Sequence, residues 1–142
     1  PTRRSSDLTA VDKSIINDNI VSKSYLINDL KESIQNTDII VITLPLTNET
    51  ENLFNESIFN NIKNNCILVN IARGKIINTK DLIKYHNKFL GLILDVFEDE
   101  PLKENDKLWD LDNIIITPHN SFVGENNDER LYKVVFDNLR GC

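Results

Sequence analysis

Three short segments carry charged or titratable residues directly after apolar runs, and these residue types could do chemistry together. Arg73 lies in ILVNIARGK, an acidic group from Asp95 to Glu100 lies in LILDVFEDEP, and His119 lies in IIITPHNSF. An arginine can bind a carboxylate through paired hydrogen bonds. A histidine can transfer protons near neutral pH, and a nearby carboxylate can orient it. The segments therefore offer an anion-binding group and an acid/base pair.

Each candidate also has an ordinary structural alternative. Arg73 could pair with a local carboxylate or meet solvent. The acidic residues Asp95, Glu98, Asp99 and Glu100 could form a solvated loop. His119 could be a hydrogen-bonded structural imidazole. We interpret the only other histidine, His86, as a surface residue on a helix.

The elements that must position these residues are short apolar runs that alternate with amphipathic stretches from Ile20 onward. This pattern is typical of an α/β protein with a mostly parallel sheet. Runs this short and apolar suit strands that are buried on both faces. We predict strands at Ile20 to Ser22, Ile39 to Thr43, Cys66 to Asn70, Leu90 to Asp95, and Asn113 to Thr117.

Four helices are expected between and after these strands. Asn28, Asn55 and Thr79 can each cap a helix, through Gln35, Ile62 and Lys88 respectively, because their side-chain oxygens can accept from unpaired backbone N–H groups. A last helix is expected from Glu125 to Leu139, ending before Gly141, with one face formed by Leu131, Val134, Val135 and Asn138.

The carboxyl edge of the predicted sheet is where the three candidate segments should meet. Open α/β sheets bind ligands outside the carboxyl ends of their strands. Residues 1–18 are polar, without a sustained period, and we interpret them as a loop or extension. The opening PTRRSSDL has the character of a foreign start.

Composition limits the class of protein. A chain of 142 residues suits one domain. Its 16 basic residues are scattered and its net charge is -6, which argues against nucleic acid or an anionic membrane as the main partner. The sequence shows no bilayer-spanning run or secretory signal, so we expect a cytoplasmic protein. Cys66 and Cys142 suggest neither a disulfide framework nor a metal site.

Four ordered segments resemble blocks of the D-isomer-specific 2-hydroxyacid dehydrogenases, and the resemblance extends from about Asn28 to Leu139. They are DIIVITLPLTNETENLF, ILVNIARGKIINTKDLI, GLILDVFEDEPL and LWDLDNIIITPHNSF. The resemblance implies a partial doubly wound, Rossmann-like parallel sheet with flanking helices. Residues 19–142 would form an incomplete NAD-binding domain and the start of the return to a substrate domain, with residues 1–18 as an extension.

The resemblance also implies roles for individual residues. Arg73 would bind the substrate carboxylate, His119 would be the acid/base, and Glu100 would support it. The cofactor, NAD with NADP not excluded, would contact Arg73 and His119 as well. Further cofactor contacts are implied along the dinucleotide at Leu44, Pro45 and Thr50, beside the nicotinamide at Ile71 and Ala72, and at its carboxamide at Asp95.

Parts of the family pattern are absent. The chain contains no G-x-G-x-x-G, because the family places this phosphate-binding turn upstream of Asn28, and we expect the acidic ribose-binding residue to be absent with it. We therefore expect the carboxy-terminal part of a longer enzyme, itself with little or no activity. Its exposed sheet edge would favour association between chains. Intact relatives are expected to be homodimers.

The implied activity is transfer of a hydride between NAD(H) and a small 2-oxo acid or D-2-hydroxy acid. One alternative is a relative that acts on another small anion such as phosphite. A second is an NADH-sensing interaction protein, similar to the family's co-repressors. A third is a flavodoxin-like binding module that carries these motifs by chance.

Overall fold

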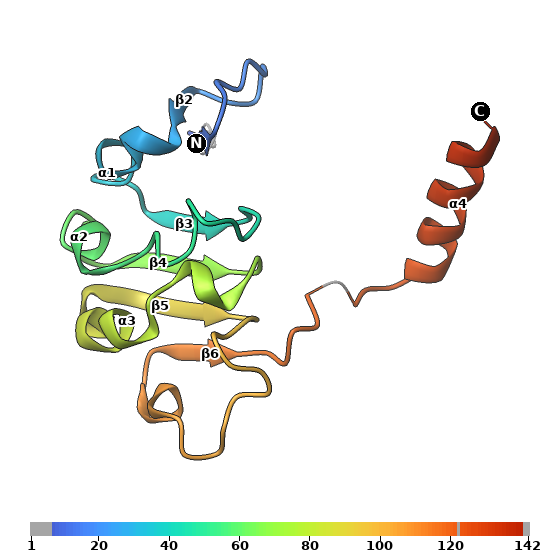
Figure 1. The fold of residues 1–142 in the computed structure, drawn as a ribbon. Coiled ribbons are helices and arrows are strands. Elements are labelled where there is room, and N and C mark those ends of the chain that lie inside the picture. The colour runs from blue at the N-terminus through green and yellow to red at the C-terminus, as the bar shows by residue number, and fades with distance from the viewer. Residues whose placement is uncertain (1–6, 122, 141–142) are drawn as a thin grey trace, which may run out of the picture.

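The computed structural model describes residues 7–121 and 123–140, and in this part strands and helices alternate along the chain (Figure 1). The strands are β1 (Thr9–Asp12), β2 (Lys23–Leu26), β3 (Ile39–Ile42), β4 (Cys66–Asn70), β5 (Phe89–Leu94) and β6 (Ile114–Ile116). The α-helices are α1 (Leu30–Ser33), α2 (Glu56–Phe59), α3 (Thr79–Tyr85) and α4 (Asn127–Arg140).

The strands β3, β4, β5 and β6 form one parallel sheet in that order. Its register aligns Leu68 of β4 with Ile40 of β3 and Leu92 of β5, and Leu92 with Ile114 of β6. All four strands therefore end at the same edge. The predicted α/β class and parallel sheet are confirmed.

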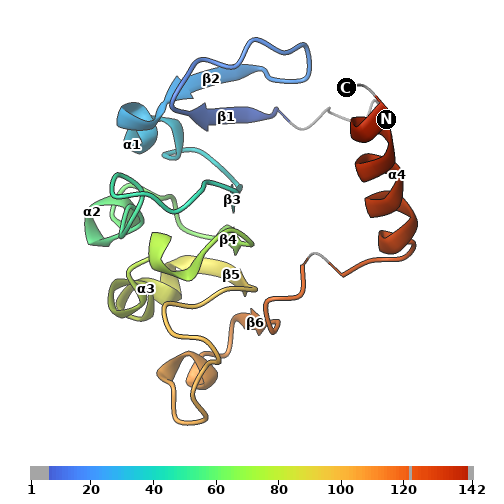
Figure 2. The same ribbon diagram turned by 45° about the vertical axis from the view of Figure 1, so that its right-hand side comes forward.

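The strands β1 and β2 form a separate parallel pair. Figure 2 shows β1 on the side of β2 that faces β3. A doubly wound sheet has the strand order 3-2-1-4-5-6. The order β2-β1 followed by β3-β4-β5-β6 matches this pattern, except that no strand is described between β1 and β3. The sheet is thus a partial Rossmann-like sheet.

The core lies on one face of the four-stranded sheet. Ile40, Leu68 and Leu92, which lie side by side on β3, β4 and β5, pack into one buried cluster with residues of the helical segments, such as Phe59 and Leu82. On the opposite face, side chains remain exposed: Ile39 56%, Val41 52%, Leu90 63% and Ile115 59%. The prediction that the strands are buried on both faces is wrong for the described part, because its helices α1, α2 and α3 pack on one face only.

Two predictions at the start of the chain are wrong. Residues Ile20–Ser22 form no strand, and β2 begins at Lys23, three residues after the predicted start. Residues 1–18 are not all loop, since β1 lies within them and its Val11 packs against the core. β1 is only four half-buried residues long, TAVD, which is too short and too polar to show a period.

The helix starts were predicted better than the helix ends. Asn55 caps α2, as predicted, by accepting a hydrogen bond from the Ser57 N–H at 3.0 Å. α3 is capped by Asn78, one residue before the predicted Thr79. Asn28 caps nothing and lies in a 3₁₀ turn, Ile27–Asp29, ahead of α1. The first three helices end earlier than predicted because each is a short crossover.

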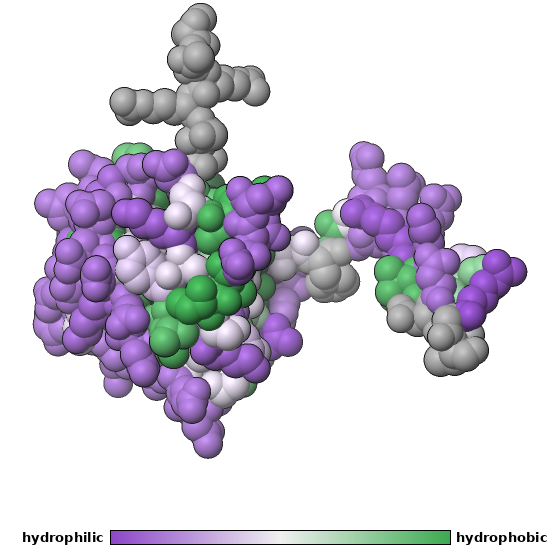
Figure 3. All heavy atoms as spheres, turned by 90° about the horizontal axis from the view of Figure 1, so that it is seen from above, coloured by the Kyte–Doolittle hydropathy of each residue, from purple (hydrophilic) through white to green (hydrophobic). Residues whose placement is uncertain are grey.

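The last helix, α4, lies apart from the sheet in Figures 1 and 2, and Figure 3 shows the same separation from above. It starts two residues later than predicted and runs to Arg140. Two members of its predicted apolar face, Leu131 and Val135, are 64% and 50% exposed. The predicted end at Gly141 lies outside the described residues. No helix among those described is long and apolar enough to cross a membrane.

Candidate active site

The turn that carries Arg73 is held by Asn70, the last residue of β4. The Asn70 Oδ1 accepts from the Ala72 N–H at 3.1 Å, and its Nδ2 donates to the Arg73 carbonyl at 3.1 Å. Asn70 is 1% exposed; its bond to the Ala72 N–H is buried and its bond to the Arg73 carbonyl is partly buried. Sequence reasoning missed this residue. The available signal was a polar residue that closes an otherwise apolar strand.

The Arg73 side chain is exposed at the carboxyl edge of the sheet. Its Nη1 donates to the Ala72 carbonyl at 2.6 Å. None of the ion pairs found among the described residues involves Arg73, so the alternative of a local carboxylate partner is not what the structure shows. Because a guanidinium has five N–H groups, Arg73 retains donors for an anion.

Gly74 allows the turn that carries Arg73 to contact the loop from Asp95 to Glu100. A Cβ atom at Gly74 would lie 1.8 Å from the carbonyl carbon of Phe97 and 1.9 Å from its oxygen. Only a residue without a side chain allows this approach of two backbones. The contact fixes the distance between the turn of Arg73 and the loop that ends at Glu100.

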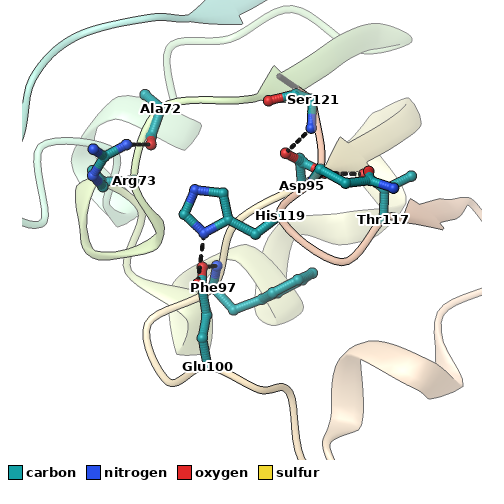
Figure 4. A network of polar contacts seen from close by, with 9 residues as sticks. Ala72, Arg73, Asp95, Phe97, Glu100, Thr117, His119 and Ser121 are labelled. Atoms are coloured by element: carbon teal, nitrogen blue, oxygen red, sulfur yellow. Dashed lines mark hydrogen bonds and ion pairs between the residues drawn. The ribbon is translucent and has the colours of Figure 1, made fainter. Parts of the chain in front are cut away.

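Glu100 and His119 form a hydrogen-bonded pair, as shown in Figure 4. The His119 Nδ1 lies 2.7 Å from the Glu100 Oε2, and the other carboxylate oxygen accepts from the Phe97 N–H at 3.0 Å. The side chain of His119 is 43% exposed and that of Glu100 is 36% exposed. The Nε2 atom of His119 is therefore the nitrogen available to a ligand.

Electrostatics keep Glu100 ionised. Burial alone would raise the pKa of Glu100. The hydrogen bonds from His119 and from the Phe97 N–H, and the nearby charge of Arg73, outweigh burial and lower that pKa below its usual value. Figure 4 shows Arg73 beside the His119–Glu100 pair. The structure thus brings together Arg73, Glu100 and His119.

Asp95 is not part of a solvated loop. It is 2% exposed and accepts from the Thr117 hydroxyl, the Asn120 N–H and the Ser121 N–H, at 2.5, 2.9 and 2.8 Å. Burial alone would raise the pKa of Asp95, but these hydrogen bonds outweigh it and lower the pKa to about 2. Glu98 is also structural, since its Oε1 accepts from the Thr79 N–H at 2.6 Å.

A pocket of about 560 Å³ opens at the carboxyl ends of β3 and β4. Most of the residues expected to contact a cofactor line it. The full lining is Thr43, Leu44, Pro45, Leu46, Ile71, Ala72 and Arg73. Thr50 stands behind this lining: it is 8% exposed and its hydroxyl donates to the Pro45 carbonyl at 2.7 Å. Thr50, Asp95 and His119 are thus the three expected contacts that do not line the pocket.

The sequence prediction also missed Asp12, an acidic residue in the separate β1–β2 pair. Asp12 is the last residue of β1 and is half-buried. In dinucleotide-binding sheets, an acidic residue that follows the glycine-rich turn by about 20 residues binds the ribose, outside the carboxyl ends of the strands. Asp12 stands at such a strand end. It was overlooked because residues 1–18 were interpreted as an extension.

The remaining titratable residues of the described part form no second centre. His86 is half-buried, with its Nδ1 2.7 Å from the Ile83 carbonyl. Cys66 is fully buried, and burial raises the pKa of its thiol. Within the described ranges, no group of three His, Cys, Asp or Glu side chains could hold a metal ion.

Comparison with known proteins places this geometry in a family. The model of the D-isomer specific 2-hydroxyacid dehydrogenase NAD binding domain matches residues 5–121. The glyoxylate reductase of Pyrococcus furiosus is 40% identical over 112 residues, which are 78% of this chain and 33% of the relative. The chain therefore spans about a third of the length of the curated relatives it matches.

Solved structures agree with this assignment. A D-isomer specific 2-hydroxyacid dehydrogenase family protein from Aeromonas salmonicida is 36% identical with a TM-score of 0.81, over 93% of this chain and 43% of that one. An NADPH-dependent glyoxylate/hydroxypyruvate reductase from Sinorhizobium meliloti, solved with NADP and sulfate, is 27% identical with a TM-score of 0.79, over 93% and 43%. These matches exclude the flavodoxin-like reading. The chain belongs to the D-isomer specific 2-hydroxyacid dehydrogenases, a family of NAD(P)-dependent oxidoreductases, and its residues 5–121 match their NAD-binding domain.

Proposed function

We propose that this chain carries the catalytic residues of an enzyme that uses NADH to reduce a small 2-oxo acid to the 2-hydroxy acid, as the D isomer where the product is chiral. The observation that carries the proposal is the 2.7 Å contact between His119 Nδ1 and Glu100 Oε2 beside the exposed guanidinium of Arg73. One cation and one acid/base pair at a single sheet edge are what a 2-oxo acid requires.

Each residue would have its own task in the reaction. Arg73 binds the substrate carboxylate through charged hydrogen bonds and so orients the neighbouring carbonyl. When bound, the cofactor supplies a hydride to the carbonyl carbon. His119 gives the proton on its Nε2 to the carbonyl oxygen, which becomes the hydroxyl. Glu100 holds the imidazole at Nδ1 and balances its charge before the transfer.

The residues at the sheet edge fit a dinucleotide. Leu44, Pro45, Ile71 and Ala72 would hold it along the pocket at the ends of β3 and β4. Thr50 would act indirectly, through its bond to the Pro45 carbonyl. The apolar Ile71 is 41% exposed there and offers a surface for the nicotinamide ring.

We propose further that Asp12 binds the adenine-side ribose and favours NAD over NADP. A carboxylate can accept from both ribose hydroxyls, whereas it repels a 2′-phosphate. Asp12→Ala should weaken NADH binding by about 10-fold to 100-fold, the effect of losing a charged hydrogen bond. The matched control is Asp112→Ala, an exposed acid just before β6 at the opposite edge of the sheet. Equal effects of the two substitutions would rule out the ribose contact.

The relatives' names suggest the substrate. Several of them are glyoxylate reductases, and we propose glyoxylate or a similarly small 2-oxo acid for this chain. The working enzyme would include a substrate domain outside these residues, with residues 19–142 as part of the NAD-binding domain and residues 1–18 partly outside it. A cytoplasmic homodimer is proposed on the same family grounds.

The test uses the complete reading frame that contains this chain. NADH and NADPH oxidation would be followed with a panel of 2-oxo acids, and NAD reduction with phosphite. We expect turnover with NADH and a small 2-oxo acid. Reduction of NAD by phosphite alone would contradict the proposed substrate class. Tight NADH binding without turnover on any substrate would contradict catalysis and favour a sensing protein.

A further inference from the structure

The loop that carries His119 has an unusual backbone. His119 has a φ of 52°, in the left-handed region that residues other than glycine seldom adopt. Its N–H donates to the Thr117 carbonyl, two residues back, at 3.1 Å. A conformation of this kind persists only where the surrounding structure holds it. Some group must therefore hold the loop on both sides of His119.

That group is the Asp95 carboxylate at the end of β5. Its Oδ1 accepts from the Thr117 hydroxyl before His119 and from the Asn120 N–H after it. Its Oδ2 accepts from the Ser121 N–H at 2.8 Å. Figure 4 shows Asp95 between Thr117 and Ser121, with His119 on the loop that joins them. A single buried carboxylate thus fastens both flanks of the left-handed residue.

We propose that Asp95 is a positioning residue that holds the Thr117–Ser121 loop so that His119 meets Glu100 and faces Arg73. This role is separate from the contact with the cofactor carboxamide that the family resemblance implies, since it rests on the bonds between Asp95 and the loop. The structural part stands on these contacts alone. The kinetic part rests on the proposed function.

The acceptor count explains why a carboxylate is needed. The groups that bond to Asp95, including the Ser121 hydroxyl, are all donors, and an ionised carboxylate accepts at both oxygens. An asparagine of the same size would turn an N–H₂ group toward one flank of the loop and leave a donor facing a donor. Asp95→Asn should therefore release one side of His119 while keeping the volume of the buried side chain.

Hydrogen exchange in the 142-residue chain tests the structural part. In Asp95→Asn, the Asn120 and Ser121 amides should exchange at least about tenfold faster, as expected for loss of a charged hydrogen bond. At labelling times too short for exchange through global unfolding, the Leu92 amide, which donates to the Asn113 carbonyl at 2.8 Å in the sheet, should stay protected in both proteins. Unchanged loop amides would overturn the proposal. Loss of Leu92 protection at these short times would overturn it too, because Asp95 would then hold the sheet and not only the loop.

The Thr117 hydroxyl separates loop positioning from a cofactor contact. Thr117→Val removes only the hydroxyl that donates to Asp95, and Thr117→Ser keeps it. We expect the valine variant to loosen the loop in the same direction as Asp95→Asn and the serine variant to match wild type. Thr37→Val, which removes a hydroxyl bonded to the Ser33 carbonyl far from the loop, is the control.

Kinetics of the complete enzyme give the second readout. If Asp95 positions His119, Asp95→Asn should lower kcat by about 100-fold, as expected for a misplacement near 1 Å, while the NADH dissociation constant changes less than about twofold. Weaker NADH binding at unchanged kcat, with Thr117→Val like wild type, would overturn positioning in favour of a cofactor contact. A wild-type enzyme without turnover would refute the proposed function and leave hydrogen exchange to decide the role of Asp95.

Discussion

Replacing Gly74 by alanine should separate the two loops that make the candidate site. The added Cβ would lie 1.8 Å from the Phe97 carbonyl carbon, and side-chain carbons essentially never come closer than 3.0 Å to such an atom. One backbone must therefore move by about 1 Å or more. Neither can move alone, because the Arg73 turn is bonded to Asn70 and the Phe97 N–H to Glu100.

The expected loss has a structural and a catalytic part. Overpacking of a tight contact costs about 1–3 kcal/mol of unfolding free energy, and a backbone clash places Gly74→Ala at the upper end. A displacement near 1 Å between Arg73 and the Glu100–His119 pair should lower kcat/KM about 100-fold in the complete enzyme. Urea unfolding of the 142-residue chain measures the first part, and steady-state kinetics measures the second.

Gly91→Ala is the matched control. It lies within β5, and nothing lies within 4 Å of an added Cβ. This substitution should be neutral or stabilise by about 0.4–1 kcal/mol, because alanine narrows the unfolded ensemble. If Gly74→Ala unfolds and turns over like Gly91→Ala, the close approach at Phe97 does not set the site geometry.

Three further predictions concern stability of the 142-residue chain. The pKa of Asp95 in the folded chain, about 2, lies below its unfolded value near 3.9. About 2 kcal/mol of unfolding free energy should therefore be fully present above pH 4 and lost as the pH falls toward 2. Urea unfolding at a series of pH values should show this loss in wild type and not in Asp95→Asn. Asn70→Ala should lower the unfolding free energy by about 1–3 kcal/mol, because it leaves the Ala72 N–H and the Arg73 carbonyl unpaired. The control Asn64→Ala, at an exposed position, should change the unfolding free energy little. Equal values for the two variants would contradict the role of Asn70 in holding the Arg73 turn. Leu68→Ala, at 0% exposure, should cost about 2–5 kcal/mol and Leu90→Ala, at 63%, far less, as thermal unfolding can check.

The four-stranded sheet and its site could be predicted because its residues carry strong local signals. Cys66–Asn70 was predicted to the residue, since an apolar run between polar neighbours has clear limits. Arg73, Glu100 and His119 were singled out as charged residues after such runs, and parallel pairing of β4, β5 and β6 brings them to one edge. Local pattern and topology agree at these positions.

The residues that support the site could not be predicted in the same way. The close approach at Gly74 and the bonds of Asp95 to the His119 loop depend on contacts between segments about 20 or more residues apart. The hydrophobic periodicity of the sequence does not reveal such contacts. β1 escaped prediction because a four-residue, half-buried strand lacks a pattern, and Asp12 at its end was therefore overlooked. β1 forms a strand because it pairs with β2.

The most direct test of the proposed chemistry is His119→Ala in the complete enzyme, with NADH oxidation by glyoxylate measured beside NADH binding. We predict that kcat/KM falls by about 10²–10⁴, the usual contribution of a general acid, while NADH binding changes less than about threefold. Turnover within a few-fold of wild type would contradict the assignment of His119 as the proton donor.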